Sequence, residues 1–116
     1  MLRIDIQSDS RTATLYCNGR IVFGMEIETL RSVALARPER VLEIDLAGIE
    51  TIDASGLGLL VELQHWASEG GRILHFTNAS EFVARLIVLT GLHCVLQFPI
   101  TTGLDSRRQA AALSAC

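Results

Sequence analysis

The sequence predicts one α/β domain built on a mixed β-sheet, with a parallel centre, an antiparallel N-terminal strand pair and helices packed against it. Three observations lead to this prediction. The chain opens with two strand-like segments, and helical and strand-like segments then alternate. Such alternation favours right-handed crossovers between parallel strands. The length of 116 residues and the 49% hydrophobic content suit a single domain with its own core.

The opening strand pair is predicted from alternation and composition. Residues 2–6 alternate apolar and polar side chains, which is the period-two pattern of a strand with one buried face. Residues 12–17 predict a second strand, and Asn18-Gly19 predicts a turn after it. The apolar run 21–23 fits the end of a strand.

The rest of the chain alternates helical and extended segments, and the core is expected within residues 1–100 of a single domain spanning 1–116. The predicted helices cover residues 25–36, about 56–69, a segment from a cap at Asn78 or Ser80 to Gly91, and about 105–114. The predicted strands cover residues 41–46, 72–76 and 94–98. Residues 47–55 are predicted as a loop, and Gly70-Gly71 as the end of the second helix.

Composition, charge and cysteine spacing argue against several classes of protein. The net charge of −3 gives no electrostatic attraction to nucleic acid or to an anionic membrane. The charged N-terminus does not resemble a signal peptide, and no apolar run is long enough to insert into a bilayer. Cys17, Cys94 and Cys116 form no CxxC pair. We therefore expect isolated thiols and a cytoplasmic location.

The densest chemical signal is the segment 49–58, between a buried strand and a helix. In open α/β sheets, ligands and partners bind at this carboxyl edge. Ser55 stands at the predicted helix N-terminus, where backbone N–H groups and the helix dipole would tolerate a phosphate, and Gly56 leaves the serine accessible. The spacing alone favours a simpler role, in which Asp53 or Ser55 only caps the helix.

The common enzyme motifs fail in this sequence. Gly56-Leu57-Gly58 begins like a dinucleotide fingerprint, but Val61 occupies the third glycine position. The chain has no lysine, so it has no phosphate-binding P-loop. A nucleophile elbow requires glycine where Asp53 stands. The three histidines lie on different predicted elements, and we predict no catalytic residue, no metal ligand and no cofactor.

The helix after Ser55 is apolar on two sides. One side carries Leu57, Leu60, Val61 and Gln64, and the other carries Leu59, Leu63 and Trp66. A helix that covers a sheet needs only one apolar stripe. The second stripe packs on a neighbouring helix, which is the more common case, or forms an exposed partner surface.

Residues 41–60, VLEIDLAGIETIDASGLGLL, resemble the STAS domain family and in particular its anti-sigma-factor antagonists. These proteins have a strand ending in Asp-Leu, a short loop, and Asp-Ser/Ala-Ser-Gly-Leu-Gly at a helix start. The segment 86–92 is similar to the end of the family's third helix, and Asn18-Gly19 to its turn after the second strand. The resemblance implies that Ser55 is phosphorylated by a partner anti-sigma factor kinase and that Asp53 shapes the loop.

The implied mechanism is partner switching, in which phosphorylation blocks binding to the anti-sigma factor serine kinase and a phosphatase restores it. The expected partner-binding residues are Asp53, Ala54, Ser55, Gly56, Leu57, Leu59, Leu63 and Trp66. One departure concerns residues 20–24, because many antagonists have Glu-x-Asp after the turn glycine. The oligomeric state is left open by the sequence.

Two rival functions remain at this stage. The same fold serves as a stand-alone STAS subunit of a lipid-transport complex or signalling scaffold, a role that the stripe of Leu59, Leu63 and Trp66 would suit. The other rival is nucleotide hydrolysis at the loop of Asp53, for which the sequence supplies no metal site and no convincing base.

Overall fold

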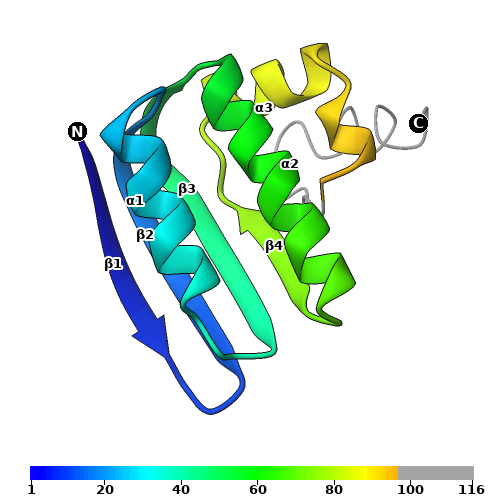
Figure 1. The fold of residues 1–116 in the computed structure, drawn as a ribbon. Helices are drawn as coiled ribbons and strands as arrows, with labels where there is room; N and C mark the ends of the chain where they lie inside the picture. The colour runs from blue at the N-terminus through cyan, green and yellow to red at the C-terminus, as the bar shows by residue number, and fades with distance from the viewer. Residues whose placement is uncertain (97–116) are drawn as a thin grey trace.

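Four strands and three helices make up residues 1–96, the part of the chain that the computed structural model describes (Figure 1). The strands are β1 (Leu2–Ser8), β2 (Thr12–Ile21), β3 (Val41–Ile52) and β4 (Ile73–Thr77). The helices are α1 (Met25–Leu35), α2 (Ala54–Glu69) and α3 (Glu81–Leu89), with a short 3₁₀ turn η1 (Leu92–Cys94). The strand order is β1-β2-β3-β4, antiparallel between β1 and β2 and parallel elsewhere, which confirms the predicted fold class.

The helices α1 and α2 cover one face of the sheet, and both begin at the edge where β2 and β3 end (Figure 1). Alternate side chains of the strands point toward these helices. The fully buried strand residues include Leu15, Ile44, Leu74 and Phe76. The helices contribute buried leucines and alanines to the same core. The β–α connections therefore meet at the carboxyl edge of the sheet, as in other parallel sheets.

Strand β3 is longer than the sequence predicts, and the expected loop 47–55 is wrong for most of its length. Pairing with β2 shifts register between Tyr16 and Asn18 and again between Gly19 and Arg20. At each shift β3 carries one extra residue, which is a β-bulge. The bulges break the period of two, so the buried residues fall at Leu46, Ile49 and Ile52. This spacing of three hides the strand from a search for alternation.

The turn predicted at Asn18-Gly19 is also wrong, because β2 continues through it to Ile21. Gly19 has a φ of 118°, and a Cβ built there would lie 2.1 Å from the backbone oxygen of Met1. The glycine permits a conformation and a close approach that other residues resist. The strand end predicted at 21–23 is correct for Ile21.

The strand predicted at residues 94–98 is wrong in its described part. Gly91 has a φ of 77°, and the N–H of Cys94 donates to its oxygen at 3.2 Å. The N–H groups of Val95 and Leu96 both donate to the oxygen of Leu92. These short-range bonds wind the segment into a helical turn. Residues 97–98 and the helix predicted at about 105–114 lie outside the described residues.

The remaining helix limits follow the predicted signals. The first helix ends at Leu35, before Pro38, and the second ends at Gly70-Gly71, where Gly71 has a φ of 68°. Ser80 is the cap of α3, accepting from the N–H of Val83 at 3.3 Å. No helix of residues 1–96 is long and apolar enough to cross a membrane.

The cysteines are only partly as expected. Cys17 is a free thiol, and burial raises its pKa to about 12. Cys94 is disulfide-bonded, so the expectation of an isolated thiol is wrong there.

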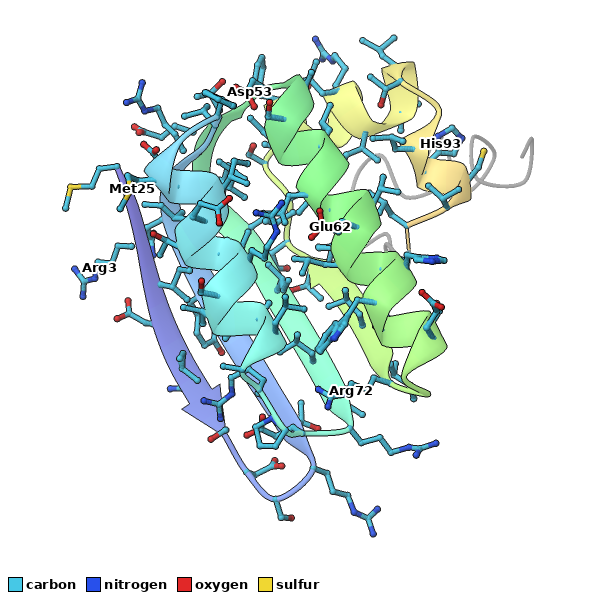
Figure 2. The ribbon with its side chains drawn as sticks, viewed as in Figure 1. Arg3, Met25, Asp53, Glu62, Arg72 and His93 are labelled. Carbon is cyan, nitrogen blue, oxygen red and sulfur yellow. The ribbon has the colours of Figure 1, made fainter. Side chains whose placement is uncertain are left out.

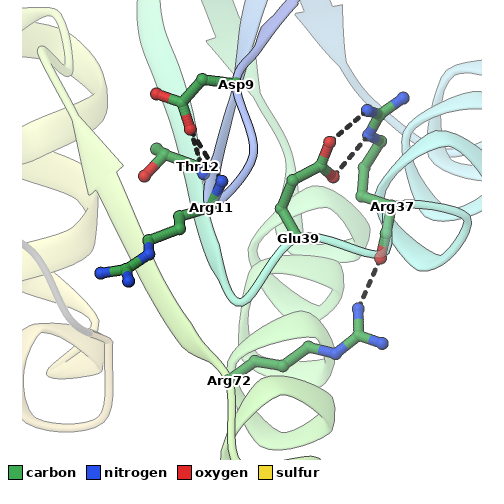
Figure 3. A network of polar contacts seen from close by, with 6 residues as sticks. All are labelled: Asp9, Arg11, Thr12, Arg37, Glu39 and Arg72. Carbon is green, nitrogen blue, oxygen red and sulfur yellow. Dashed lines mark hydrogen bonds and ion pairs between the residues drawn. The ribbon is translucent and has the colours of Figure 1, made fainter.

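A polar network closes the opposite edge of the sheet, where β3 and β4 begin (Figure 3). Arg37 pairs with Glu39 at 2.6 Å, and the Glu39 side chain is only 8% exposed. The Arg72 guanidinium donates to the backbone oxygen of Arg37. This bond ties the start of β4 to the connection between α1 and β3. The carboxylate of Asp9 accepts from the N–H of Thr12 and shapes the β1–β2 turn.

The stripe of Leu59, Leu63 and Trp66 on α2 belongs to the core at its two leucines. The exposed fraction of Leu59 is 2% and that of Leu63 is 0%. Of the two alternatives for these side chains, packing inside the fold is therefore correct and an exposed partner surface is wrong. They are buried because α2 packs against β3, β4 and α1 together and needs apolar side chains on more than one side.

Leu63→Ala tests this burial. We expect a loss of about 2–5 kcal/mol in the free energy of unfolding, because the substitution opens a cavity in the core. Urea unfolding followed by circular dichroism measures it. The matched control is Leu89→Ala on α3, since Leu89 is 73% exposed. Equal losses for the two variants would contradict the assigned packing of α2.

Candidate functional site

The Asp53 carboxylate joins two backbone segments at the carboxyl edge of the sheet. One oxygen accepts from the N–H of Gly56 at 2.8 Å, which caps α2. The other accepts from the N–H of Phe23 at 3.0 Å, in the β2–α1 connection. Figure 2 shows Asp53 at the start of α2. These two backbone donors, with a smaller effect of the Ser55 N–H, hold the pKa of Asp53 below its ordinary value.

Ser55 lies in the first turn of α2, because the helix begins two residues earlier than the sequence predicts. The helix starts at Ala54, with Asp53 as its N-cap. The Ser55 side chain is exposed, and among the described residues no hydrogen bond engages its hydroxyl. Asp53 is therefore the cap, and the Ser55 hydroxyl is available to another molecule.

Gly56 and Gly58 differ in what surrounds them. A Cβ at Gly56 would lie 2.1 Å from the backbone oxygen of Ile21, so α2 can approach the end of β2 only with glycine there. Around Gly58 there is nothing within 4 Å of a built Cβ. An interior helix glycine costs stability, and the fold of residues 1–96 gives no packing reason for this one. Ala54, Ser55 and Gly58 thus form a smooth exposed strip.

Phe23 is the residue that the sequence reasoning missed. Its backbone is held by Asp53, yet its side chain is 81% exposed. Met25, at the start of α1, is 77% exposed at the same edge. The only signal in the sequence was the departure of residues 20–24 from the antagonist pattern.

The predicted partner residues do not all share one surface. Ala54 and Ser55 are exposed and Asp53 is half-buried, whereas Gly56 and Leu57 are buried together with Leu59 and Leu63. Trp66 is half-buried, with the Arg72 guanidinium 4.7 Å from its ring centre. It lies eleven residues after Ser55, about 16 Å along the helix. Trp66 therefore stands apart from the Ser55 strip.

Within residues 1–96 no group of three or more histidine, cysteine or acidic side chains lies close enough to hold a metal ion. The site thus consists of a helix start, an exposed hydroxyl and an exposed phenylalanine. We call the exposed set Phe23, Ala54, Ser55 and Gly58 the Ser55 surface.

The match to a known family decides the assignment of the chain. Residues 24–97 match the family model described as Mlab, STAS domain. The chain belongs to the STAS domain family. The match begins beside Phe23 and covers Asp53, Ser55 and the whole of α2. Comparison with curated protein sequences gave no significant match.

Solved structures share the STAS fold at low sequence identity. The unphosphorylated anti-sigma factor antagonist SpoIIAA has a TM-score of 0.68 at 13% identity, over 94% of this chain and 96% of its own. An anti-sigma factor antagonist from Mycobacterium paratuberculosis has a TM-score of 0.66 at 20% identity, over 99% and 93%. A variant of RsbS from Moorella thermoacetica has a TM-score of 0.64 at 19% identity, over 94% and 97%.

Asp53→Ala tests the cap. We expect a loss of about 1 kcal/mol at neutral pH, because the N–H groups of Gly56 and Phe23 lose their acceptor. The folded pKa of Asp53 is lowered, so its carboxylate contributes fully above the ordinary pKa of about 3.9 and loses that contribution as the pH falls below it. Urea unfolding from pH 7 down to about pH 2.5 should therefore show the difference between the two proteins shrinking once the pH falls below about 3.9. A difference independent of pH would argue against the carboxylate, and Asp53→Asn, which keeps one acceptor, should lose less.

The paired substitutions Gly56→Ala and Gly58→Ala test the two glycine roles. Gly56→Ala should destabilise the fold by about 1–3 kcal/mol, because its methyl group meets the backbone of Ile21. Gly58→Ala should stabilise it by up to about 1 kcal/mol, because alanine is the better helix former and space is open. Thermal unfolding of both variants measures this, and the same sign of change in both would contradict the geometry.

Proposed function

We propose that this STAS protein is an anti-sigma factor antagonist whose Ser55 surface binds an anti-sigma factor kinase, and that phosphorylation of Ser55 by that kinase ends the binding. The observation that carries the proposal is the exposed, unbonded hydroxyl of Ser55 beside a helix cap already supplied by Asp53. In this function the chain has no catalytic role, and the kinase supplies the base and ATP. A phosphatase would reverse the modification, in the cytoplasm.

The free protein would tolerate the phosphate. A phosphoserine adds about −1.5 to −2 charges, and the first turn of a helix favours negative charge through its free N–H groups and dipole. Since Ser55 lies in the first turn of α2 and is exposed, the modified side chain needs no repacking of the core. Phosphorylation is thus expected to change the surface and leave the fold intact.

The proposed complex with the kinase would not tolerate a phosphate on Ser55. Burying an unpaired charge in an interface costs several kcal/mol, and every 1.4 kcal/mol is about tenfold in affinity. Asp53 is ionised at neutral pH, as an aspartate with an ordinary or lowered pKa is, and adds negative charge beside Ser55. A switch of several orders of magnitude in affinity is therefore physically reasonable.

Phe23 supplies the apolar part of the proposed contact. Interfaces draw most of their binding energy from a few large side chains at the centre. Phe23 is 81% exposed, and its backbone N–H donates to Asp53, which stands two residues before Ser55. Gly58 would let the partner's backbone approach α2 closely, which gives this exposed glycine a use.

The structural comparisons support this function to the extent of the shared fold. One similar structure is SpoIIAA of Bacillus in its phosphorylated form, with a TM-score of 0.65 at 12% identity, over 93% of this chain and 99% of its own. The second candidate function is a subunit of a lipid-transport complex or a signalling scaffold. The description of the matching family model names no anti-sigma factor and so leaves this candidate open.

Phosphorylation and binding measured together test the proposal. Anti-sigma factor kinases from the same genome are incubated one at a time with ATP and the wild-type chain, Ser55→Ala or Ser55→Glu. We expect one kinase to add a single phosphate to Ser55, found by mass spectrometry, and none to Ser55→Ala. Calorimetry with that kinase should show binding to Ser55→Ala but at least about a hundredfold weaker binding to Ser55→Glu, as the cost of a buried charge predicts.

Two controls locate the contact. Phe23→Ala should weaken kinase binding, whereas Leu89→Ala should not, although both remove a large exposed side chain. Phosphate at another position, or on Ser55→Ala as well, would overturn the proposal. Failure to bind any kinase, with co-purification of a membrane permease instead, would support the second candidate.

A further inference from the structure

The outer edge of β1 pairs with no other strand among residues 1–96 (Figure 1). Two bonds at the ends of the β1–β2 ladder show which backbone groups face outward. The N–H of Arg20 donates to the oxygen of Met1 at 3.1 Å, and the N–H of Asp9 donates to the oxygen of Thr12 at 2.9 Å. Because bonded pairs alternate in antiparallel ladders, the odd-numbered residues of β1 bond to β2. The even-numbered residues therefore direct their N–H and C=O groups to the free edge.

The segment Leu2-Arg3-Ile4-Asp5-Ile6 is complementary to itself in the antiparallel direction. Two copies related by a two-fold axis at Ile4 place Ile4 opposite Ile4, Leu2 opposite Ile6, and Arg3 opposite Asp5. Both apolar pairings involve even-numbered residues, so they fall on the positions that can form backbone hydrogen bonds. The Arg3–Asp5 pairings fall between them, where side chains of facing strands come closest.

Charge and exposure agree with this alignment. Arg3 and Asp5 pair with each other within β1, with 3.4 Å between Nε and Oδ2, and their side chains remain 75% and 56% exposed to a second copy. Figure 2 shows Arg3 projecting away from the sheet. Opposite charges on facing strands stabilise their pairing, and like charges destabilise it. Ile6 is 44% exposed, and Leu2 of a second copy would cover it. The strand has no proline, and its register with β2 has no bulge, so it lacks two common devices that protect an edge.

We infer that β1 is the interface of a symmetric homodimer, in which two copies of this chain join their sheets into one continuous eight-stranded sheet. Facing residues of antiparallel strands point to the same side of a sheet. The helices of both copies therefore lie on one face, and the two-fold axis is perpendicular to the sheet. The carboxyl edges then point in opposite directions, so both Ser55 surfaces stay uncovered. The dimer does not depend on the proposed function.

Charge exchange tests the alignment. Arg3→Asp and Asp5→Arg each place like charges opposite each other, and each should weaken dimerisation about tenfold. An equimolar mixture of the two variants should restore it, because the acidic strand of one faces the basic strand of the other. Sedimentation equilibrium over a range of concentrations measures the association, with Arg85→Asp on α3 as a control that makes the same charge change elsewhere.

Loss of dimerisation can be distinguished from loss of folding. Arg3 and Asp5 are exposed, so thermal unfolding should be little changed in the monomer of either variant. A wild-type chain that stays monomeric at every concentration overturns the inference. A dimer that persists in both single variants, or a mixture that fails to associate, shows that another surface or another register joins the copies and also overturns it.

Discussion

The geometry of the carboxyl edge depends on the close approach between the first turn of α2 and the end of β2. Gly56 makes the approach possible because no side chain stands between it and the Ile21 backbone. The Asp53 carboxylate then bonds to both sides of the contact, through the N–H groups of Gly56 and Phe23. The position of α2 on the sheet, the exposure of Ser55 and the place of Phe23 all follow from this junction.

The sequence was sufficient for the elements whose pattern is regular. Helix α1 has one apolar stripe and a proline after it, and α2 ends at two glycines, so both were found. It was not sufficient where tertiary contacts replace the local pattern. Two β-bulges place the buried residues of β3 three positions apart. Gly19 lies inside a strand, where it permits close approach of the Met1 backbone, and does not form a turn.

In the candidate site, too, local sequence features reveal some residues and tertiary contacts determine the others. Asp53 and Ser55 could be found because a cap and a following helix are local features. The burial of Leu59 and Leu63 was only one of two alternatives that the sequence left open, because it depends on how many elements surround α2. Phe23 was missed since its importance comes from a bond to a residue thirty positions later in the chain. A single sequence offers no periodicity from which such a bond can be derived.

The bonds of Asp53 have a consequence for how such proteins diversify. Both of its acceptor contacts are to backbone N–H groups, which every residue except proline provides. The side chains at positions 23 and 55 can therefore be exchanged during evolution without removing the donors that fix the junction. The scaffold thus separates the backbone groups that build the junction from the side chains that the junction exposes. Single substitutions at these exposed positions can change the surface on an unchanged framework.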